Sequence, residues 1–464
     1  MIKRHDIVKH LNDLVCEGNL VEHIVEDVKA AFAKDLEYAE NRAIFDAVYA
    51  EYASSSNYLD KAMVIRSKIM KLTNKNIWFL VDQSTHRKLP YDHANIKLLF
   101  KKATDHILTP RLEICNLGYD PFKPQDFYLE QGSKFLNLYR CPDWRFKNFY
   151  DNEPIPACPI PPVVDEFLDW VFANEFSKTF ALDWMAHSLR TKNLTYLMLI
   201  AIEGLGKGIL GDFMYYAHGK ENTLYIEFDK FDAKFNAHLA NRTFIYVDEL
   251  KVENSKQENN LKAFINPEMN VEKKGIDVYQ ATNFASYLMS SNFNSAVRIS
   301  ATDRRYSFPD LKKVPLRELA ETKYNMKVQD YVKTVLETEP NFEGFARHLW
   351  TRTITSDLSQ PPKTEQALRV RMASKKEWEV YFIQVFCKER AGEQNLLHEI
   401  IRTQLDNTMN RKVNATWEAI KKLEQEFPGV FTATQKRVEG KGKPRVIDIL
   451  PADQQKDYPF EILD

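Results

Sequence analysis

A glycine-rich segment with one lysine follows an apolar run at residues 197–210, which read LMLIAIEGLGKGIL. Glycines allow backbone N–H groups to turn toward phosphate oxygens, and the start of a following helix favours a bound anion. Lys207 adds the positive charge that suits the β- and γ-phosphates of a nucleotide. The segment therefore predicts a phosphate-binding loop. Its contacts would come from Gly204, Leu205, Gly206, Lys207, Gly208 and Ile209.

The match to the usual pattern GxxxxGK[ST] is imperfect, because Ala201 stands at the first glycine and Gly208 at the Ser/Thr position. The missing hydroxyl removes one Mg²⁺ ligand, and we expect water to replace it. A tight glycine turn with a surface lysine gives the same letters. The loop alone therefore leaves both interpretations open.

Two carboxylates end a second apolar run, TFIYVDE, at Asp248 and Glu249. Acidic residues at the carboxyl end of a strand lie where α/β sheets bind ligands. We expect Asp248 to hold Mg²⁺ through its water shell and Glu249 to polarise the water that attacks the γ-phosphate. The alternative is an ordinary strand end with two solvated acids.

Two further polar features follow in the chain. Asn292 ends the run 284–292 and is predicted to bind the γ-phosphate or its water, although Ser-Asn is also a turn signal. Arg304 and Arg305 lie in TDRRY, and one of them is predicted to act as an arginine finger on a neighbouring subunit's nucleotide. The alternative is a surface arginine paired with Asp303.

The elements around these residues predict a multi-domain α/β protein. From about residue 164, short apolar runs alternate with helical segments, which indicates a largely parallel sheet. Residues 58–73 are predicted as one of the helices of a helical N-terminal region. The predicted domains are a collar-like helical region at 1–110, a connector with short strands at 111–163, a core at 164–315, a helical connector at 316–361 and a C-terminal unit at 362–464.

The C-terminal unit combines three helices with a strand–turn–strand segment, which predicts a winged-helix-like domain. The turn segment carries Lys436, Arg437 and Lys441. Basic wings contact nucleic-acid phosphates. Winged helices also serve protein packing, so the pattern leaves that alternative open.

Composition limits the function classes. The net charge is −1, from 64 Lys+Arg against 65 Asp+Glu, so any DNA contact must use local patches. No run of 18 apolar residues and no signal-peptide pattern is present, so we expect no membrane association. The five cysteines are widely spaced without a CxxC pair, which fits a reducing compartment. We therefore expect a cytoplasmic protein, in a bacterial host if it is phage-encoded.

The ordered set of motifs resembles the superfamily 3 helicases, specifically the primase-helicases of phages and plasmids, over about 167–309. The stretches that carry the resemblance include LDWMAHSLRT, GLGKG, FIYVDE, YLMSSN and ISATDRRYSF. Members often have glycine after the loop lysine, whereas Ala201 remains a departure. The resemblance implies an AAA+-type core and a homo-oligomeric ring, usually a hexamer. It also implies a hairpin at 271–278 whose Lys273 and Lys274 grip single-stranded DNA; a polar surface hairpin is the alternative.

These observations together predict an enzyme, an ATP hydrolase that acts as an ATP- and Mg²⁺-dependent DNA helicase translocating on single-stranded DNA in phage or plasmid replication. The expected partners are replication forks, further copies of the chain, and a primase or polymerase domain or partner. One alternative is a non-motor ATP-binding initiator or scaffold, against which Glu249 argues because binding alone needs no water-polarising acid. A small-molecule kinase is another. Whether the chain stands alone or is part of a longer protein stays open.

Overall fold

The computed structural model describes residues 114–454, apart from 131, 300–302, 428 and 436–443, together with three strands between 69 and 92 and residues 42, 43 and 46. The chain divides into two compact units, Met1–Arg140 and Cys141–Asp464. The finer subdivision expected from the sequence stays a prediction. In the part of the chain that the structure describes, no helix is long and apolar enough to cross a membrane.

The first unit contains a six-stranded sheet in the order β3-β2-β1-β4-β6-β5. Its strands are β1 Ile69–Leu72, β2 Ile77–Val81, β3 Lys88–Asp92, β4 Ile114–Gly118, β5 Phe127–Glu130 and β6 Ser133–Asn137. The helix predicted over 58–73 is therefore wrong at its end. Strand β1 lies inside the sheet, antiparallel to β2 and parallel to β4, so pairing on both edges overrides its helical pattern. Of the other helices predicted before residue 110, the structure describes only residues 42, 43 and 46, which are helical, and the rest lie outside the described residues.

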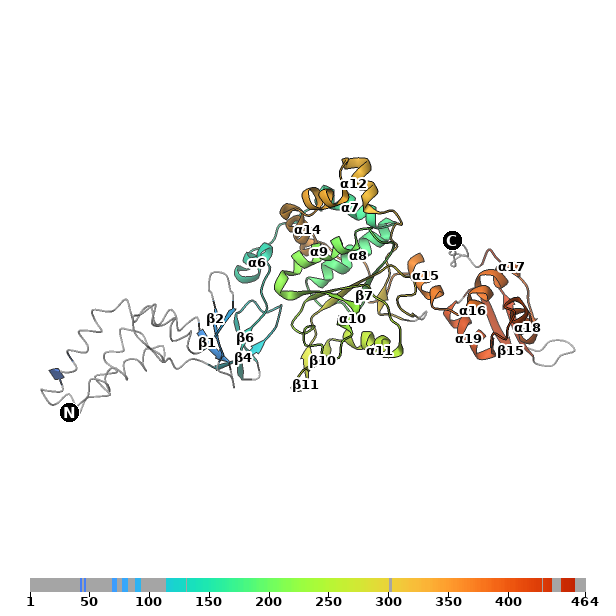
Figure 1. The fold of residues 1–464 in the computed structure, drawn as a ribbon, viewed down its shortest axis with the longest axis horizontal. Coiled ribbons are helices and arrows are strands. Elements are labelled where there is room, and N and C mark those ends of the chain that lie inside the picture. Colours follow the sequence, from blue (N-terminus) through green and yellow to red (C-terminus); the bar gives the residue numbers. More distant parts are fainter. Residues whose placement is uncertain are drawn as a thin grey trace. The chain divides into compact units, whose positions relative to one another are not determined.

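The second unit is built on a five-stranded parallel sheet in the order β13-β7-β12-β9-β8, which confirms the predicted parallel sheet. Figure 1 labels β7 within this sheet. The strands are β7 Tyr196–Ile200, β8 Thr223–Glu227, β9 Phe244–Asp248, β12 Ser286–Ser291 and β13 Tyr306–Ser307. Strand β12 lies between β7 and β9, although it follows both in the sequence. The ends of these three strands are therefore neighbours.

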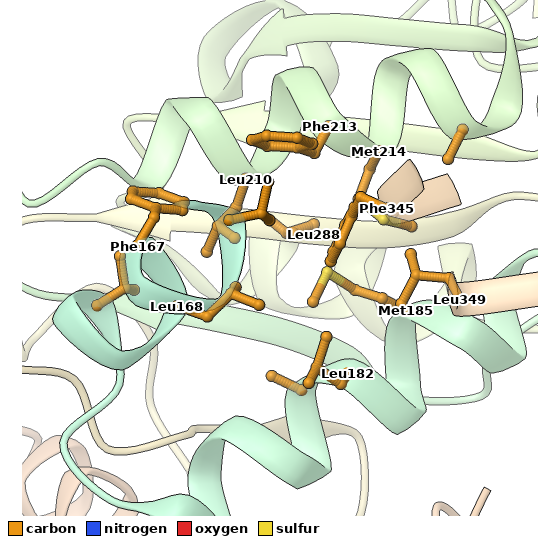
Figure 2. Packing of buried hydrophobic residues seen from close by; sticks show 14 of the residues in the cluster. Phe167, Leu168, Leu182, Met185, Leu210, Phe213, Met214, Leu288, Phe345 and Leu349 are labelled. Carbon is orange, nitrogen blue, oxygen red and sulfur yellow. The ribbon is translucent and has the colours of Figure 1, made fainter. Parts of the chain in front are cut away.

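Helices cover one face of this sheet: α7 Pro162–Val171, α8 Glu175–Ser188, α9 Lys207–His218 and α14 Glu339–Thr351. Figure 2 shows the core between them, to which Phe213 of α9, Phe345 of α14, Phe167 of α7 and Leu288 of β12 belong. All four side chains are fully buried. Burial of this many large apolar side chains fixes α9 and the loop before it against the sheet.

The other face is covered by α10 Phe228–Phe231, α11 Ser255–Phe264 and a hairpin of β10 Glu268–Lys273 and β11 Ile276–Thr282. Its core includes Tyr287, Phe231 and Met269. Alternate residues of the strands thus belong to the two cores, as expected for a sheet covered on both faces.

The C-terminal part contains the helices and the hairpin that the sequence predicts, and β14 adds a third strand to the hairpin. It consists of α15 Glu365–Ala373, α16 Glu377–Tyr381, a π-helical turn Phe382–Phe386, α17 Cys387–Glu389, β14 Leu396–Leu397, α18 His398–Thr408, α19 Trp417–Glu426, β15 Phe431–Gln435 and β16 Arg445–Ile449. Lys436, Arg437 and Lys441 lie outside the described residues.

The remaining elements of the second unit are short. They are the 3₁₀ turns Asp143–Arg145 and Lys220–Asn222, α6 Phe146–Asp151, α12 Leu316–Tyr324, α13 Val328–Tyr331 and a π-helical turn Val332–Leu336. The last three lie within 316–361, whose assignment as a separate helical connector stays a prediction.

Candidate nucleotide-binding site

The glycine-rich loop connects β7 to α9 through two residues with left-handed backbone. Gly204 has φ +76° and Gly206 has φ +105°, a region that glycine adopts without steric cost. Helix α9 begins at Lys207, and no side chain caps its first turn. The start of this twelve-residue helix therefore presents backbone N–H groups and the positive end of the helix dipole to an anion.

Buried neighbours hold the loop in this shape. Leu205 is fully buried, and the Gly204 carbonyl accepts a hydrogen bond from the Leu316 N–H at 2.9 Å. A Cβ atom at Gly206 would lie only 2.8 Å from Cε2 of Phe167. The loop is thus clamped between α7 and the start of α12, and glycine is required at its tightest contact.

We expect the Gly206→Ala substitution to destabilise the second unit by about 2 kcal/mol or more, because it adds left-handed strain to overpacking against Phe167. Urea unfolding followed by tryptophan fluorescence measures the change. Gly275→Ala is the matched control, since Gly275 has φ +77° but a Cβ there would meet nothing within 4 Å. Equal destabilisation by the two variants would contradict the role assigned to the Phe167 contact.

Lys207 lies at the centre of the polar site. Its Nζ donates to the carbonyls of Ala201 at 2.6 Å and Ile202 at 2.9 Å, and to Oδ1 of Asn292 at 2.6 Å. Burial lowers the pKa of Lys207 to about 8, against the opposing effect of Asp248 and Glu203. Because pH 7 lies below this value, the lysine is mostly protonated there and carries the charge that a phosphate needs.

Asp248, the last residue of β9, accepts three hydrogen bonds. The Ser290 hydroxyl and the Glu249 N–H (2.9 Å) donate to Oδ1, and the Tyr225 hydroxyl donates to Oδ2 at 3.2 Å. Glu249 itself has φ 55° and an exposed side chain. Three hydrogen bonds fix the Asp248 carboxylate, whereas the Glu249 side chain is exposed, so the two acids occupy different environments.

Strand order explains why these groups meet. Asn292 directly follows β12, the neighbour of both β7 and β9, so its amide reaches the loop lysine. The carboxyl ends of parallel strands form one edge of the sheet, where α/β proteins bind ligands. Lys207, Asp248 and Asn292 therefore lie together at this edge of the sheet, with Glu249 beside them. The sequence analysis had identified each of them from a separate stretch of the chain.

The two arginines lie at the opposite edge of the same sheet. The Arg305 carbonyl accepts from the N–H of Tyr196, the first residue of β7, at 2.7 Å. The Arg305 N–H donates to Oδ1 of Asp303 at 3.0 Å, and its guanidinium lies 3.5 Å from the same oxygen, whereas Arg304 is exposed. Because β7 separates them from the glycine loop, neither arginine reaches the site of its own chain. A finger role therefore requires another subunit.

The hairpin places its cations at an exposed tip. Strands β10 and β11 are antiparallel with a bulge between Val271 and Lys273, and Gly275 forms the turn. Lys273 and Lys274 are both exposed. This geometry gives two adjacent positive charges free access to a polyanion.

Two residues of the site escaped the sequence analysis, Tyr225 on β8 and Ser290 on β12. Both touch Asp248 through a hydroxyl. Tyr225 belongs to no recognisable pattern, and nothing in the stretch YLMSSN marks the Ser290 hydroxyl as a partner of Asp248. Strand pairing alone reveals them. Strand β8 pairs with β9 and sets Tyr225 opposite Tyr246, and β12 pairs with β9 on its other side.

The donor set fits a nucleotide-bound cation better than a free one. Within the described ranges, no group of three or more His, Cys, Asp and Glu side chains is placed to hold a metal ion. Mg²⁺ keeps several waters and is commonly bound through one or two carboxylates together with substrate phosphates. Asp248 beside an open helix start and a lysine matches that requirement.

Comparison with known proteins connects the chain to phage DNA replication. A protein family of unknown function, DUF5906, matches residues 199–305. The DNA primase-polymerase of Nitratiruptor phage NrS-1 is 25% identical over 248 residues, which cover 50% of this chain and 31% of that protein. The chain thus matches less than a third of the relative's length. The homology is to a phage replication protein, and membership of superfamily 3 is not shown.

Solved structures share the fold. The apo structure of the NrS-1 C-terminal region has a TM-score of 0.62 at 16% identity, covering 84% of this chain and 98% of that one. An A-form apo structure of the same region has a TM-score of 0.61 at 15% identity, with the same coverage of both chains.

The predicted ATP-dependent DNA helicase is therefore wrong, because the homology is to a DNA primase-polymerase, which points to primase or polymerase activity instead. The physical reason is that these motifs indicate a ligand and not an activity. A glycine loop, a lysine and a strand-end acid are typical of a triphosphate-binding site, and a fold with such a site serves many activities. Translocation along DNA does not follow from these residues.

Proposed function

We propose that this chain is the nucleoside-triphosphate-binding module of a primase-polymerase-type DNA replication protein. The observation that carries the proposal is the convergence of Lys207, Asn292 and Asp248 at the glycine loop, with Lys207 Nζ 2.6 Å from Asn292 Oδ1. The relation to a phage primase-polymerase supports the replication context. We further propose that the protein acts in the cytoplasm of the host cell.

Each residue has a distinct proposed role. The backbone from Gly204 to Ile209 binds the phosphates, and Lys207 exchanges its carbonyl partners for phosphate oxygens. Asn292 is released toward the γ-phosphate when Lys207 turns. Mg²⁺, when bound with the nucleotide, neutralises the charge on the phosphates, and Asp248 holds its water shell. Glu249, exposed next to Asp248, polarises the water that attacks the γ-phosphate, which makes the module an ATP hydrolase.

The strand order supports an AAA+-type core, because the inserted β12 carries the amide that contacts the loop lysine. The C-terminal helices with a three-stranded sheet support a winged-helix-like domain.

The position of Arg304 and Arg305 at the far edge of the sheet supports an oligomer, a ring of six in our proposal, in which one of them reaches a neighbour's nucleotide. Light scattering after gel filtration with Mg·ATP tests the oligomer.

The hairpin is the proposed contact for single-stranded DNA. Replacing Lys273 and Lys274 together by alanine should weaken DNA binding several-fold and lower the slope of log affinity against log salt by about 1.4, or 0.7 for each lost phosphate contact. Fluorescence anisotropy with a labelled oligonucleotide at several salt concentrations measures both quantities. Alanines at Lys312 and Lys313, another adjacent pair, are the control. An unchanged slope in the hairpin variant would argue against this contact.

Phosphate release from Mg·ATP by the full chain tests the proposed hydrolysis. We expect release that depends on Mg²⁺. Nucleotide binding without release would remove the role of Glu249 but keep the binding module, whereas folded protein that neither binds nor hydrolyses ATP would contradict the proposal as a whole.

A further inference from the structure

We propose that the Tyr225 hydroxyl replaces the Ser/Thr hydroxyl that Gly208 lacks, so that nucleotide-bound Mg²⁺ is held from β8 by Tyr225 together with Asp248. This inference rests on the proposed function and names a further metal-positioning residue. It also gives a reason for the glycine at position 208, which the sequence pattern presents only as a defect.

The hydroxyl of Tyr225 lies where the missing one is needed. A Cβ atom built at Gly208 would have the Tyr225 hydroxyl oxygen 3.7 Å away as its nearest neighbour. The same hydroxyl donates to Oδ2 of Asp248 at 3.2 Å. In phosphate-binding loops the Ser/Thr hydroxyl and the strand-end aspartate share the metal. Here the Tyr225 hydroxyl lies beside the first turn of α9 and also contacts that aspartate.

Two glycines of α9 make room for this arrangement. Gly208 and Gly211 are one helical turn apart and therefore lie on the same face of the helix. A Cβ at Gly211 would lie 2.7 Å from Cδ2 of Tyr246, the residue opposite Tyr225 on β9. The Tyr225 and Tyr246 rings stack with centroids 4.5 Å apart and an interplanar angle of 29°. The stack fixes the Tyr225 ring, so its hydroxyl is presented in one place.

The hydroxyl is accessible. Tyr225 is 48% exposed although its ring is stacked, so a ligand can approach from solvent. The phenol is a hydroxyl, as serine or threonine would supply, and it can bind the metal directly or through water.

The competing explanation is that Tyr225 only orients Asp248. Supplying a hydroxyl from a different element distinguishes the two explanations. In the Tyr225→Phe background, Gly208→Ser returns a hydroxyl to helix α9. The space around Gly208 accepts the serine side chain, and the φ of Gly208 is not left-handed. A serine there supplies a metal ligand without recreating the tyrosine side chain.

The test uses the full chain and the fluorescent nucleotide mant-ATP, with Mg²⁺ titrated at a fixed nucleotide concentration. We expect Tyr225→Phe to raise the Mg²⁺ midpoint about tenfold or more, because loss of such a partner typically costs 10–100-fold in metal affinity. Adding Gly208→Ser should return the midpoint most of the way to the wild-type value. Tyr381→Phe, which removes a tyrosine hydroxyl from the helix α16, is the control and should leave the midpoint unchanged.

Three results would overturn the inference, and circular dichroism must show folded protein in each. An unchanged midpoint in Tyr225→Phe removes the hydroxyl from metal binding. If Tyr225→Phe raises the midpoint and Gly208→Ser does not lower it again, Tyr225 only orients Asp248. Wild-type protein that binds no mant-ATP at any Mg²⁺ concentration overturns this inference together with the proposed function, whereas the first two results leave the proposed function intact.

Discussion

Lys207→Ala should weaken ATP binding at least about 100-fold. A hydrogen bond to a charged group contributes about 1.5–3 kcal/mol, and Lys207 is expected to make two or more of them to the phosphates; each 1.4 kcal/mol changes affinity tenfold. The Lys207 ammonium group donates to two carbonyls and to Asn292. The variant also leaves those acceptors without their donor, so the loop loses an internal contact as well as the charge.

Isothermal titration with Mg·ATP measures this effect. Lys220→Ala is the matched control, because Lys220 is exposed beyond the carboxyl end of α9 and lies outside the glycine loop. Equal affinities for the wild type and the Lys207 variant would show that the glycine loop is only a tight turn, which is the alternative that the sequence pattern leaves open.

Glu249→Gln should separate binding from hydrolysis. The substitution keeps the size and hydrogen-bonding reach of the side chain but removes the base, and general base catalysis contributes about 10²–10⁴-fold to a rate. We expect ATP affinity within a few-fold of the wild type and a loss of turnover of that order. Because Glu249 already has φ 55°, glutamine adds no new backbone strain at this position.

A comparison of steady-state phosphate release with ATP affinity in the same preparation measures this separation. Glu253→Gln serves as the control, since Glu253 is exposed and paired with Lys251 at 2.9 Å. Unaltered turnover in the Glu249 variant would mean that another group activates water. A parallel loss of affinity would instead place Glu249 in nucleotide or metal binding.

Local sequence features were sufficient to predict the elements of the site. The apolar run before the glycines predicts β7, and glycine followed by a helical pattern predicts the loop and α9. Asp248 was placed at a strand end for the same reason. These predictions depend on residues adjacent in the chain, for which composition and spacing carry the information.

Strand order and pairing were not predictable in this way. The contact between Lys207 and Asn292 depends on β12 entering the sheet between β7 and β9. The contact between Tyr225 and Asp248 depends on the register of β8 with β9. Strand β1 shows that pairing can also override a local pattern. Its residues have a helical pattern, but they form a strand because they pair with two neighbouring strands. Non-local pairing decided all three.

The functional prediction failed at a different level. The sequence pattern predicts residues that bind a triphosphate, and that prediction awaits the binding experiments, but the conclusion that the protein unwinds DNA came from a family resemblance. The homology found is to a phage primase-polymerase, of which this chain covers 31%. A nucleotide site therefore constrains the ligand much more than it constrains the process in which the ligand is used.

Equilibrium binding of mant-ATP to the wild-type chain, with and without Mg²⁺, tests the central claim most directly. Our account predicts saturable binding that unlabelled ATP displaces, that Mg²⁺ strengthens, and that Lys207→Ala abolishes. Folded wild-type protein that gives no saturable signal up to millimolar nucleotide, or a signal that Lys207→Ala leaves unchanged, would contradict the assignment of the glycine loop as a nucleotide site.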